Sequence, residues 1–179
     1  TTLEAIEILE GATSGEYDFG AVIGSRGWHP GVVGIVASRL SKKIHRPVFV
    51  VAIDENGIGK GSGRSIEGIS LVDFIESNQG VLENGGGHDM AAGITLKEES
   101  LKLLNDNLQT FVSSQINSSL FTPKIEVDCS CELNELNIEL LDHYRKLEPF
   151  GFDNPEPVLV CSNVSRSEEH TSELQSLTN

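Results

Sequence analysis

The chain has 179 residues, of which 38% are hydrophobic and 22% charged, and its formal net charge is −14. This acidity by itself argues against nucleic-acid binding, because proteins that bind DNA or RNA usually carry a basic surface. A basic cleft on an acidic body still fits the sequence, since the first half contains these basic residues: Arg26, Arg39, Lys42, Lys43, Arg46, Lys60 and Arg64. No apolar run reaches the roughly 18 residues of a membrane span, and the acidic N-terminus does not resemble a signal peptide.

The first half of the chain predicts alternating helices and strands. Residues 1–10 are typical of the end of an amphipathic helix, and a short apolar strand follows at 18–24. The next helix begins near Pro30 and carries an apolar stripe to Leu40. The continuous apolar run 48–53 predicts a strand buried on both faces. The pattern continues with a turn at 54–57, a strand at 58–63, a helix at 69–77, a tight glycine loop at 85–87, a strand at 90–96 and a helix at 97–116.

A boundary is expected between residues 117 and 123, and a shorter unit follows it. Alternating apolar residues predict a strand at 124–131, then a helix at 133–147 and a strand at 158–161, with prolines between them that exclude a helix. This unit is too short to close a sheet of its own. The tail, residues 165–179, has no apolar periodicity. It resembles either a translated sequencing adaptor or a natural disordered tail, and we exclude it from the fold.

Three cysteines are too few for a metal site, and an odd count is unusual for a disulfide framework. Cys129 and Cys131 alternate with Ser130, so both side chains are expected on one face of a strand, whereas Cys161 stands alone. We expect all three to be free thiols in a reducing cytoplasm.

Three glycine-containing segments are expected at one edge of the sheet, where ligands bind in α/β layers. The first, residues 24–31, joins a strand to a helix N-terminus, where free backbone N–H groups and the helix dipole attract anions. Trp28 offers a surface on which a base could stack, and Arg26 and His29 add charge. The alternative interpretation is that Trp28 is a core residue and His29 caps the helix.

The second segment, residues 60–65, combines small residues with good phosphate donors. Glycines let the backbone approach a ligand closely, and the hydroxyls of Ser62 and Ser65 can donate to a phosphate. The guanidinium of Arg64 can pair with a phosphate through two hydrogen bonds. The alternative is a hairpin or bulge with a surface arginine.

The third segment, residues 84–93, contains three consecutive glycines followed by a histidine. Gly85, Gly86 and Gly87 permit a nest of backbone N–H groups, a concavity that holds anions, with His88 at its exit. The alternative is a turn that serves packing alone. His88 and Asp89 form a pair rather than a metal-binding cluster.

The sequence contains neither the phosphate-binding loop of nucleotide hydrolases nor a nucleophile elbow. Cys129 and Cys131 have no convincing base nearby. The residues alone therefore predict an α/β domain with three anion-binding segments, no catalytic residue and no metal site.

These segments resemble the C-terminal substrate-binding domain of the DHH phosphoesterase superfamily. Gly86-Gly87-His88 matches the Gly-Gly-His signature of that domain, which is shared with oligoribonucleases, cyclic-dinucleotide phosphodiesterases and editing relatives of alanyl-tRNA synthetase. Longer stretches narrow the resemblance to the RecJ exonuclease group: residues 27–40, 61–65, 147–151 and 154–157. The last two open the OB-fold domain that RecJ-type enzymes carry and small oligoribonucleases lack.

The resemblance implies a fold and a division into domains. The expected fold class is α/β, with a mixed-sheet DHH-associated domain and flanking helices, followed by a truncated, β-rich OB-fold segment. The expected boundaries are an interdomain helix end at 1–15, the DHH-associated domain at 16–117, the start of the OB-fold domain at 118–164, and the tail at 165–179.

The resemblance also implies a function. RecJ-type enzymes hydrolyse single-stranded DNA from the 5′ end, and two ions, Mn²⁺ or Mg²⁺, are held by an N-terminal DHH domain that this sequence does not contain. The chain would then bind single-stranded DNA without cutting it, as a monomer in the cytoplasm and away from membranes. The expected substrate-binding residues are Trp28, His29, Ser62, Arg64, Ser65, Gly85, Gly86, Gly87 and His88.

Three alternatives remain open at this point. The chain could come from an oligoribonuclease or cyclic-dinucleotide phosphodiesterase of the same superfamily, although the proline-rich stretch 148–157 argues against this. It could also be a non-catalytic nucleic-acid-binding module, or a small-molecule-binding domain whose glycines serve only as turns.

Overall fold

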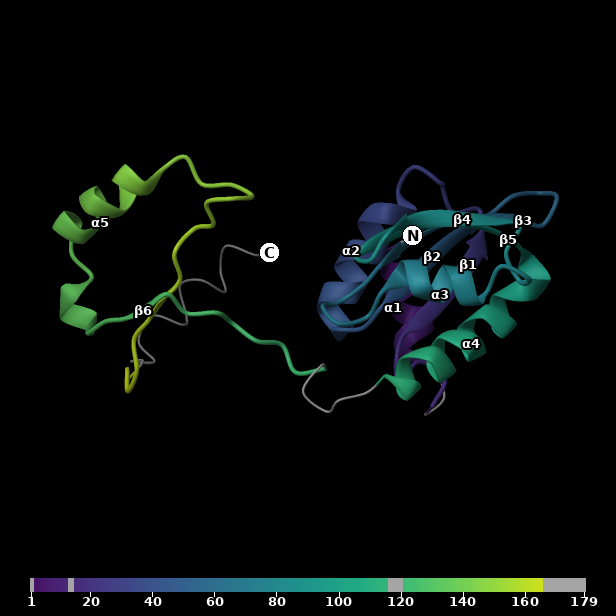
Figure 1. Ribbon diagram of the computed structural model, residues 1–179, viewed down its shortest axis with the longest axis horizontal. Helices are drawn as coiled ribbons and strands as arrows, with labels where there is room; N and C mark the ends of the chain where they lie inside the picture. Colours follow the sequence, from purple (N-terminus) through teal and green to yellow (C-terminus); the bar gives the residue numbers. More distant parts are fainter. Residues whose placement is uncertain (1, 13–14, 116–120, 166–179) are drawn as a thin grey trace. The chain divides into compact units, whose positions relative to one another are not determined.

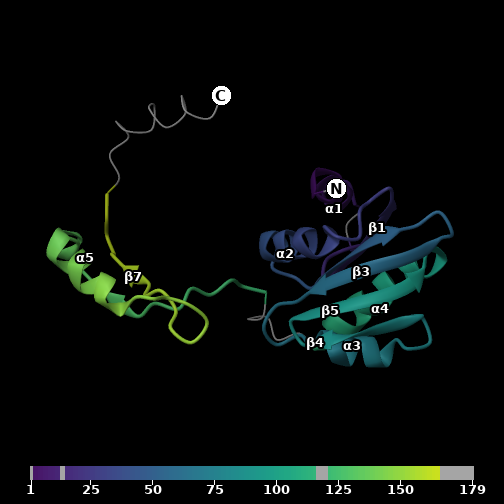
Figure 2. The same cartoon turned by 90° about the horizontal axis from the view of Figure 1, so that it is seen from above.

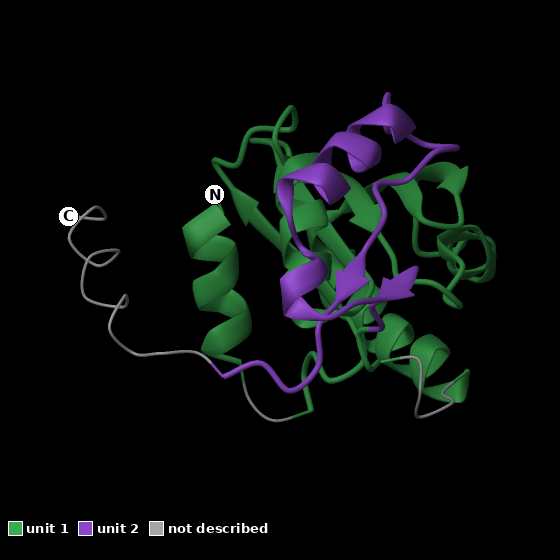
Figure 3. Cartoon of the chain, turned by 90° about the vertical axis from the view of Figure 1, so that its left-hand side faces the viewer, with its two compact units in different colours: residues 1–123 green, residues 124–179 purple. Residues whose placement is uncertain are grey.

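The computed structural model describes residues 2–12, 15–115 and 121–165. The chain divides into two compact units, residues 1–123 and residues 124–179 (Figure 3). None of the helices in the described ranges is both long and apolar enough to span a membrane.

The first unit is built on a five-stranded mixed sheet (Figure 1). The strands lie in the order β1-β2-β3-β5-β4, in which β1 pairs with β2 in parallel and the other neighbours are antiparallel. Together with its helices, this sheet confirms the predicted mixed α/β fold. The strand bounds are β1 (Ala21–Arg26), β2 (Val48–Ile53), β3 (Ile58–Arg64), β4 (Asn84–His88) and β5 (Ala91–Lys97).

Helices pack on both faces of this sheet (Figure 2). On one face α1 (Thr2–Glu10) and α2 (Val33–Ile44) cover β1 and β2, with Ile23, Val48 and Val50 in the shared core. On the other face α3 (Leu71–Ser77) and α4 (Leu101–Ser114) enclose the larger core around Phe49 and Phe74. Every residue of β2 is buried, so the prediction of a strand buried on both faces is confirmed. A short 3-10 turn, η1 (Glu98–Ser100), precedes α4.

The face that α2 covers over β2 and β3 is open to solvent over β5 and β4. In β5 the residues Ala92, Ile94 and Leu96 are buried in the larger core, whereas Gly93 on the opposite face is exposed. All residues of β4 are exposed. Half of one sheet face is therefore available to a ligand.

Two of the three predicted ligand-binding segments lie in strands, and for the triglycine this corrects the predicted tight loop. Residues 60–64 lie inside β3, and the triglycine forms most of β4, so no nest of N–H groups is built there. The glycines of β3 have a packing role instead, because a side chain at Gly63 would overlap the Phe49 ring, and one at Gly61 would lie 2.9 Å from Val51. Glycines that were predicted to let a ligand approach the backbone thus make room for bulky side chains of β2.

The second unit contains little regular structure in its described residues. Its helical segments are η2 (Leu133–Glu135), α5 (Ile138–Tyr144) and η3 (Arg145–Leu147), and its strands β6 (Cys129–Ser130) and β7 (Leu159–Val160) form a parallel pair. The two strands expected at 124–131 and 158–161 are therefore much shorter than predicted. Ile125 and Val127 are exposed, so the alternation there has no core to bury it, and a two-stranded pair is marginal without one. The tail prediction falls almost wholly on residues 166–179, outside the described residues.

Candidate functional site

The side of the sheet that α2 covers in part presents three rows of residues that lie opposite one another across β3, β5 and β4. We call this surface the open face. Its first row is Arg64–Ala91–His88, its second is Ser62–Gly93–Gly86, and its third is Lys60–Thr95–Asn84. Side chains at alternate positions of a strand share a face, so the three strands bring these nine residues together. The middle row therefore consists of small residues, and the rows on either side of it carry longer polar side chains.

Gly86 and Gly93 form the floor of the open face. A Cβ atom on Gly86 would meet no heavy atom within 4 Å, and one on Gly93 would meet only the Gly61 carbonyl oxygen, at 3.9 Å. Neither glycine has a positive φ angle. The fold therefore does not require glycine at either position. What the two glycines provide is space for close approach to the backbone from the solvent side.

Gly87 has a different role from its neighbours. Its φ angle is 150°, and a Cβ atom there would lie 2.6 Å from the Ala92 Cα. Gly85 faces the other side of the sheet, where a Cβ atom would lie 2.9 Å from the Ile75 side chain. Of the three predicted glycines, only Gly86 lies on the open face, and the other two are explained by the fold.

Arg64 and Ser62 form a pair beneath the first turn of α2. The Arg64 Nη1 group donates to the Ser62 hydroxyl oxygen at 3.0 Å and to the Gly63 carbonyl oxygen at 2.7 Å. A Cβ atom on Gly34 of α2 would lie 3.3 Å from the Ser62 oxygen and 3.6 Å from Arg64 Nη2. The guanidinium is thus held beside the positive end of the α2 dipole, where an anion would be stabilised.

His88 completes the first row at the outer edge of the sheet. Its side chain is exposed, and it lies two strands from Arg64, a separation of about 10 Å at normal strand spacing. This separation is larger than the width of one phosphate group. Arg64 and His88 would therefore contact different phosphates or different parts of one nucleotide. Ser70 donates a hydrogen bond at 2.7 Å to the carboxylate of Asp89, the residue next to His88, so this acid already has a partner.

Ser65 does not belong to the open face. Its side chain is buried, and its hydroxyl donates to the Ile69 carbonyl oxygen at 2.7 Å. The hydroxyl shapes the turn between β3 and α3 and is not available to a phosphate in this arrangement.

Trp28 is a core residue, as the alternative interpretation held. Its side chain is 6% exposed, and its indole N–H donates to Glu4 of α1 at 2.7 Å. Base stacking on Trp28 would require this packing to open. The hydrogen bond lowers the pKa of the Glu4 carboxyl, because it stabilises the ionised form.

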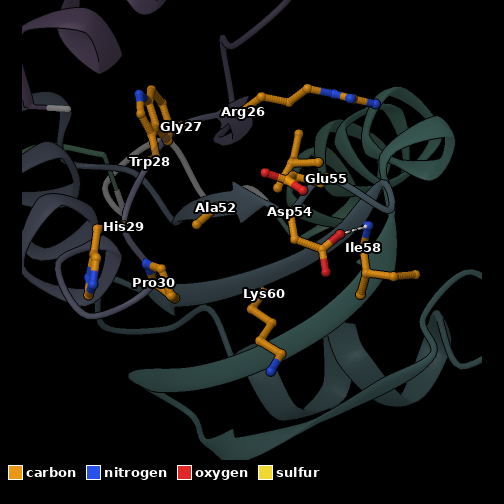
Figure 4. Close-up of a pocket in the computed structure, with 11 residues that line it drawn as sticks. Arg26, Gly27, Trp28, His29, Pro30, Ala52, Asp54, Glu55, Ile58 and Lys60 are labelled. Atoms are coloured by element: carbon orange, nitrogen blue, oxygen red, sulfur yellow. Dashed lines mark hydrogen bonds between the residues drawn. The ribbon is translucent and has the colours of Figure 1, made fainter.

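His29 and Lys60 line a pocket of about 520 Å³ at the ends of β1 and β2 (Figure 4). The His29 Nδ1 atom accepts from the Gly31 N–H at 3.0 Å, so the ring closes the turn before α2 rather than capping the helix. Asp54 is occupied by the turn, since its Oδ1 atom accepts from the N–H groups of Asn56 and Ile58. Lys60 belongs to both this pocket and the open face, and it connects them.

Arg26 contributes little net charge to this pocket. It makes an ion pair with Glu98, which raises the pKa of the Arg26 guanidinium and lowers that of the Glu98 carboxyl. Both side chains are exposed, so this is a surface ion pair that connects the end of β1 to η1.

Five residues of the open face were not predicted as site residues: Lys60, Asn84, Ala91, Gly93 and Thr95. A signal for them exists in the sequence. The strand predicted at 58–63 alternates, so it already places Lys60 and Ser62 on one face, and Arg64 is the next residue in the same alternation. Gly93 could be found only by pairing β5 with its neighbours.

The described residues contain no group of three histidine, cysteine, aspartate or glutamate side chains that could hold a metal ion. They therefore do not fit the two-ion site that the resemblance implies.

Trp28 provides an internal reporter, because it is the chain's single tryptophan. We expect saturation with single-stranded DNA to leave its fluorescence nearly unchanged, since the buried ring cannot stack on a base. Acrylamide quenching of the free protein should confirm burial. Strong quenching by DNA would restore the stacking interpretation.

Two domain families match this chain. The DHHA1 domain model matches residues 18–114, and the RecJ OB domain model matches residues 127–172. The chain belongs to the DHHA1 domain family, and its second unit resembles the RecJ OB domain. The resemblance inferred from the glycine-histidine and RecJ-type motifs is thereby confirmed.

The similar curated proteins are RecJ enzymes. The chain is 40% identical to the single-stranded-DNA-specific exonuclease RecJ of Bacillus subtilis over 91% of its length, and 37% identical to the Escherichia coli enzyme over 73%. These alignments cover 21% and 23% of the two relatives. The chain thus spans under a quarter of their length.

Solved structures agree with this assignment. The Mn²⁺ complex of RecJ from Thermus thermophilus matches 94% of this chain and 25% of that one, with a TM-score of 0.75 and 27% identity. The Mg²⁺ complex matches with a TM-score of 0.71 and 30% identity, covering 87% of this chain and 24% of that one.

Proposed function

We propose that this chain is the substrate-holding part of a RecJ-type exonuclease and that it binds single-stranded DNA along the open face. In the whole enzyme this grip would serve 5′→3′ hydrolysis of phosphodiester bonds in DNA repair and recombination. A DHH domain outside this sequence would hold two divalent ions, Mn²⁺ or Mg²⁺. These ions would activate water and stabilise the displaced oxygen. The chain itself would position the strand as a monomer.

The central glycine row is the observation that carries this proposal. Gly86 and Gly93 leave an unobstructed floor that neither packing nor backbone geometry requires. Polar residues flank that floor on both sides: Lys60, Ser62, Arg64, Asn84, His88 and Thr95. A flat floor between rows of donors suits a chain of phosphates and sugars better than a compact small molecule, which usually requires an enclosed pocket.

Four of these polar residues, Lys60, Ser62, Arg64 and His88, have a specific role in this proposal. Arg64, oriented by Ser62, would hold one phosphate with its guanidinium, and His88 would contact the backbone one position away. Lys60 would extend the track toward the pocket that His29 lines. Charge-assisted hydrogen bonds of this kind contribute on the order of 1.5–3 kcal/mol each. Fixing the DNA strand in this way would lower the entropic part of the activation barrier to phosphoryl transfer.

The alternatives within the superfamily have less support. The RecJ OB domain match over 127–172 favours a RecJ-type enzyme over an oligoribonuclease or cyclic-dinucleotide phosphodiesterase. A non-catalytic DNA-binding module would use the same open face, so a binding measurement cannot separate it from an exonuclease. An assay of nuclease activity on the whole protein separates the two.

Arg64→Ala and His88→Ala are expected to weaken binding of a short 5′-phosphorylated oligonucleotide by about tenfold or more, because each removes a phosphate contact. Fluorescence anisotropy of the 179-residue chain at two salt concentrations measures this. The salt dependence should also decrease in Arg64→Ala, since fewer counterions are released when the guanidinium is removed.

Lys102→Ala is the matched control, because Lys102 is an exposed cation on α4, which covers the other face of the sheet. We expect its affinity to equal that of the unmodified chain. Equal affinities for all three variants would place the DNA contacts outside the open face and refute the proposal.

A further inference from the structure

Two cysteines of the second unit lie side by side although they are 30 positions apart in the sequence. The Cys131 and Cys161 sulfur atoms are 3.4 Å apart, and both side chains are partly buried. The sequence had suggested that Cys161 stands alone, and the structure corrects this. The two residues directly follow the paired strands β6 and β7, and the Cys131 N–H donates to the Val160 carbonyl oxygen at 3.0 Å.

This placement satisfies the geometry of a disulfide. Strands pair at a spacing of about 4.7–4.9 Å, and bridged cysteines have Cα atoms about 4.4–6.8 Å apart. Bond formation requires the sulfurs to close from 3.4 Å to about 2.05 Å, a movement that side-chain rotation can supply. Cys129 has Leu159 opposite it, and its thiol lies 3.3 Å from the Ser130 carbonyl oxygen, so it is not placed to compete.

We propose that Cys131 and Cys161 form a reversible disulfide by exchange with a small-molecule disulfide such as oxidised glutathione. One cysteine thiolate attacks a glutathione sulfur, forms a mixed disulfide and releases one reduced glutathione. The second cysteine, as its thiolate, then attacks the protein sulfur of the mixed disulfide and releases the other. The two cysteines lose two electrons and two protons in total, and one oxidised glutathione becomes two reduced molecules.

The environment of the pair suits a structural switch better than a catalytic thiol. The hydrogen bond with Cys161 raises the pKa of Cys131 to about 11, and partial burial and the nearby acidic groups, including Glu135, act in the same direction. Reactive cysteines instead have thiols whose pKa is lowered by cations or helix N-termini. The smaller thiolate fraction should make the exchange slow, so the pair is expected to remain as two thiols in a reducing compartment and to close only on equilibration with an oxidised glutathione pool.

Closing the pair would stabilise a unit that has little else to hold it. Its two paired strands contain two residues each. A bond between residues 131 and 161 closes a loop through α5, which reduces the freedom of the unfolded chain. Oxidised protein should accordingly resist proteolysis within residues 124–165 more than reduced protein.

Mass spectrometry after equilibration in defined glutathione ratios tests the proposal. The 179-residue chain is alkylated and digested, and the expected product is a 131–161 linked peptide lighter by two hydrogen atoms, with Cys129 alkylated. Dithiothreitol should reverse the link, and Cys129→Ser should retain it. Cys161→Ser should instead accumulate a glutathione adduct on Cys131. Full alkylation of all three cysteines in the most oxidising mixture, or a link through Cys129, would overturn the proposal.

Discussion

Gly93→Val is expected to abolish most binding of single-stranded DNA while leaving the fold intact. The β-branched side chain would project from the centre of the open face, where the nearest heavy atom to a Cβ is 3.9 Å away. Valine favours strands more than glycine does, so the free energy of unfolding should stay the same or rise by up to about 1 kcal/mol. We expect at least a tenfold loss of affinity in fluorescence anisotropy, with an unchanged or higher Tm.

Gly63→Val is the matched control for this variant, since Gly63 lies on a neighbouring strand but faces the core. Its side chain would overlap the Phe49 ring, so this variant should lose stability by about 1–3 kcal/mol. The two glycines therefore separate a ligand role from a packing role. Loss of stability in Gly93→Val, or unimpaired binding, would contradict the role assigned to the open face.

Phe74→Ala should produce a large loss of stability, about 3–5 kcal/mol. Phe74 is fully buried and packs against Phe49 of β2 and Phe111 of α4, with ring centroids 5.7 Å and 5.4 Å apart. Removing it would leave a cavity between the sheet and both helices of that face. Because small domains are stable by only about 5–15 kcal/mol, the midpoint of urea denaturation should fall sharply.

Leu103→Ala is the control for this variant, because Leu103 is exposed on α4. Its midpoint should change little. If Phe74→Ala unfolds at nearly the same urea concentration as the unmodified chain, α3 is not held to the sheet by this aromatic cluster.

The sequence predicts most of the sheet, because hydrophobic periodicity is a local property. The apolar run 48–53 and the alternation at 58–63 and 90–96 correspond to β2, β3 and β5. The triglycine was misinterpreted as a loop, because glycine in a strand is uncommon and its usual meaning is a turn. Only the pairing with β5 shows that residues 84–88 are extended.

The candidate site depended more on tertiary information than the fold did. Motif resemblance identified Ser62, Arg64, Gly86 and His88, which do share one surface. It also named Trp28 and Ser65, whose polar atoms are engaged inside the domain. Local sequence cannot distinguish these cases, because burial is decided by which helix covers which strand. The nearness of Cys131 to Cys161 likewise depends on a strand pairing across 30 residues.

The most direct test of the DNA-binding face is an NMR titration of the ¹⁵N-labelled 179-residue chain with a 5′-phosphorylated single-stranded oligonucleotide. The amide signals of Gly86 and Gly93 are particularly informative, since glycine amides lie in a characteristic part of the spectrum. We predict that the largest shifts fall on residues 60–64, 84–88 and 91–95, with little change in α4. Shifts concentrated in α4 or in residues 124–165, with these three strands unaffected, would contradict the account.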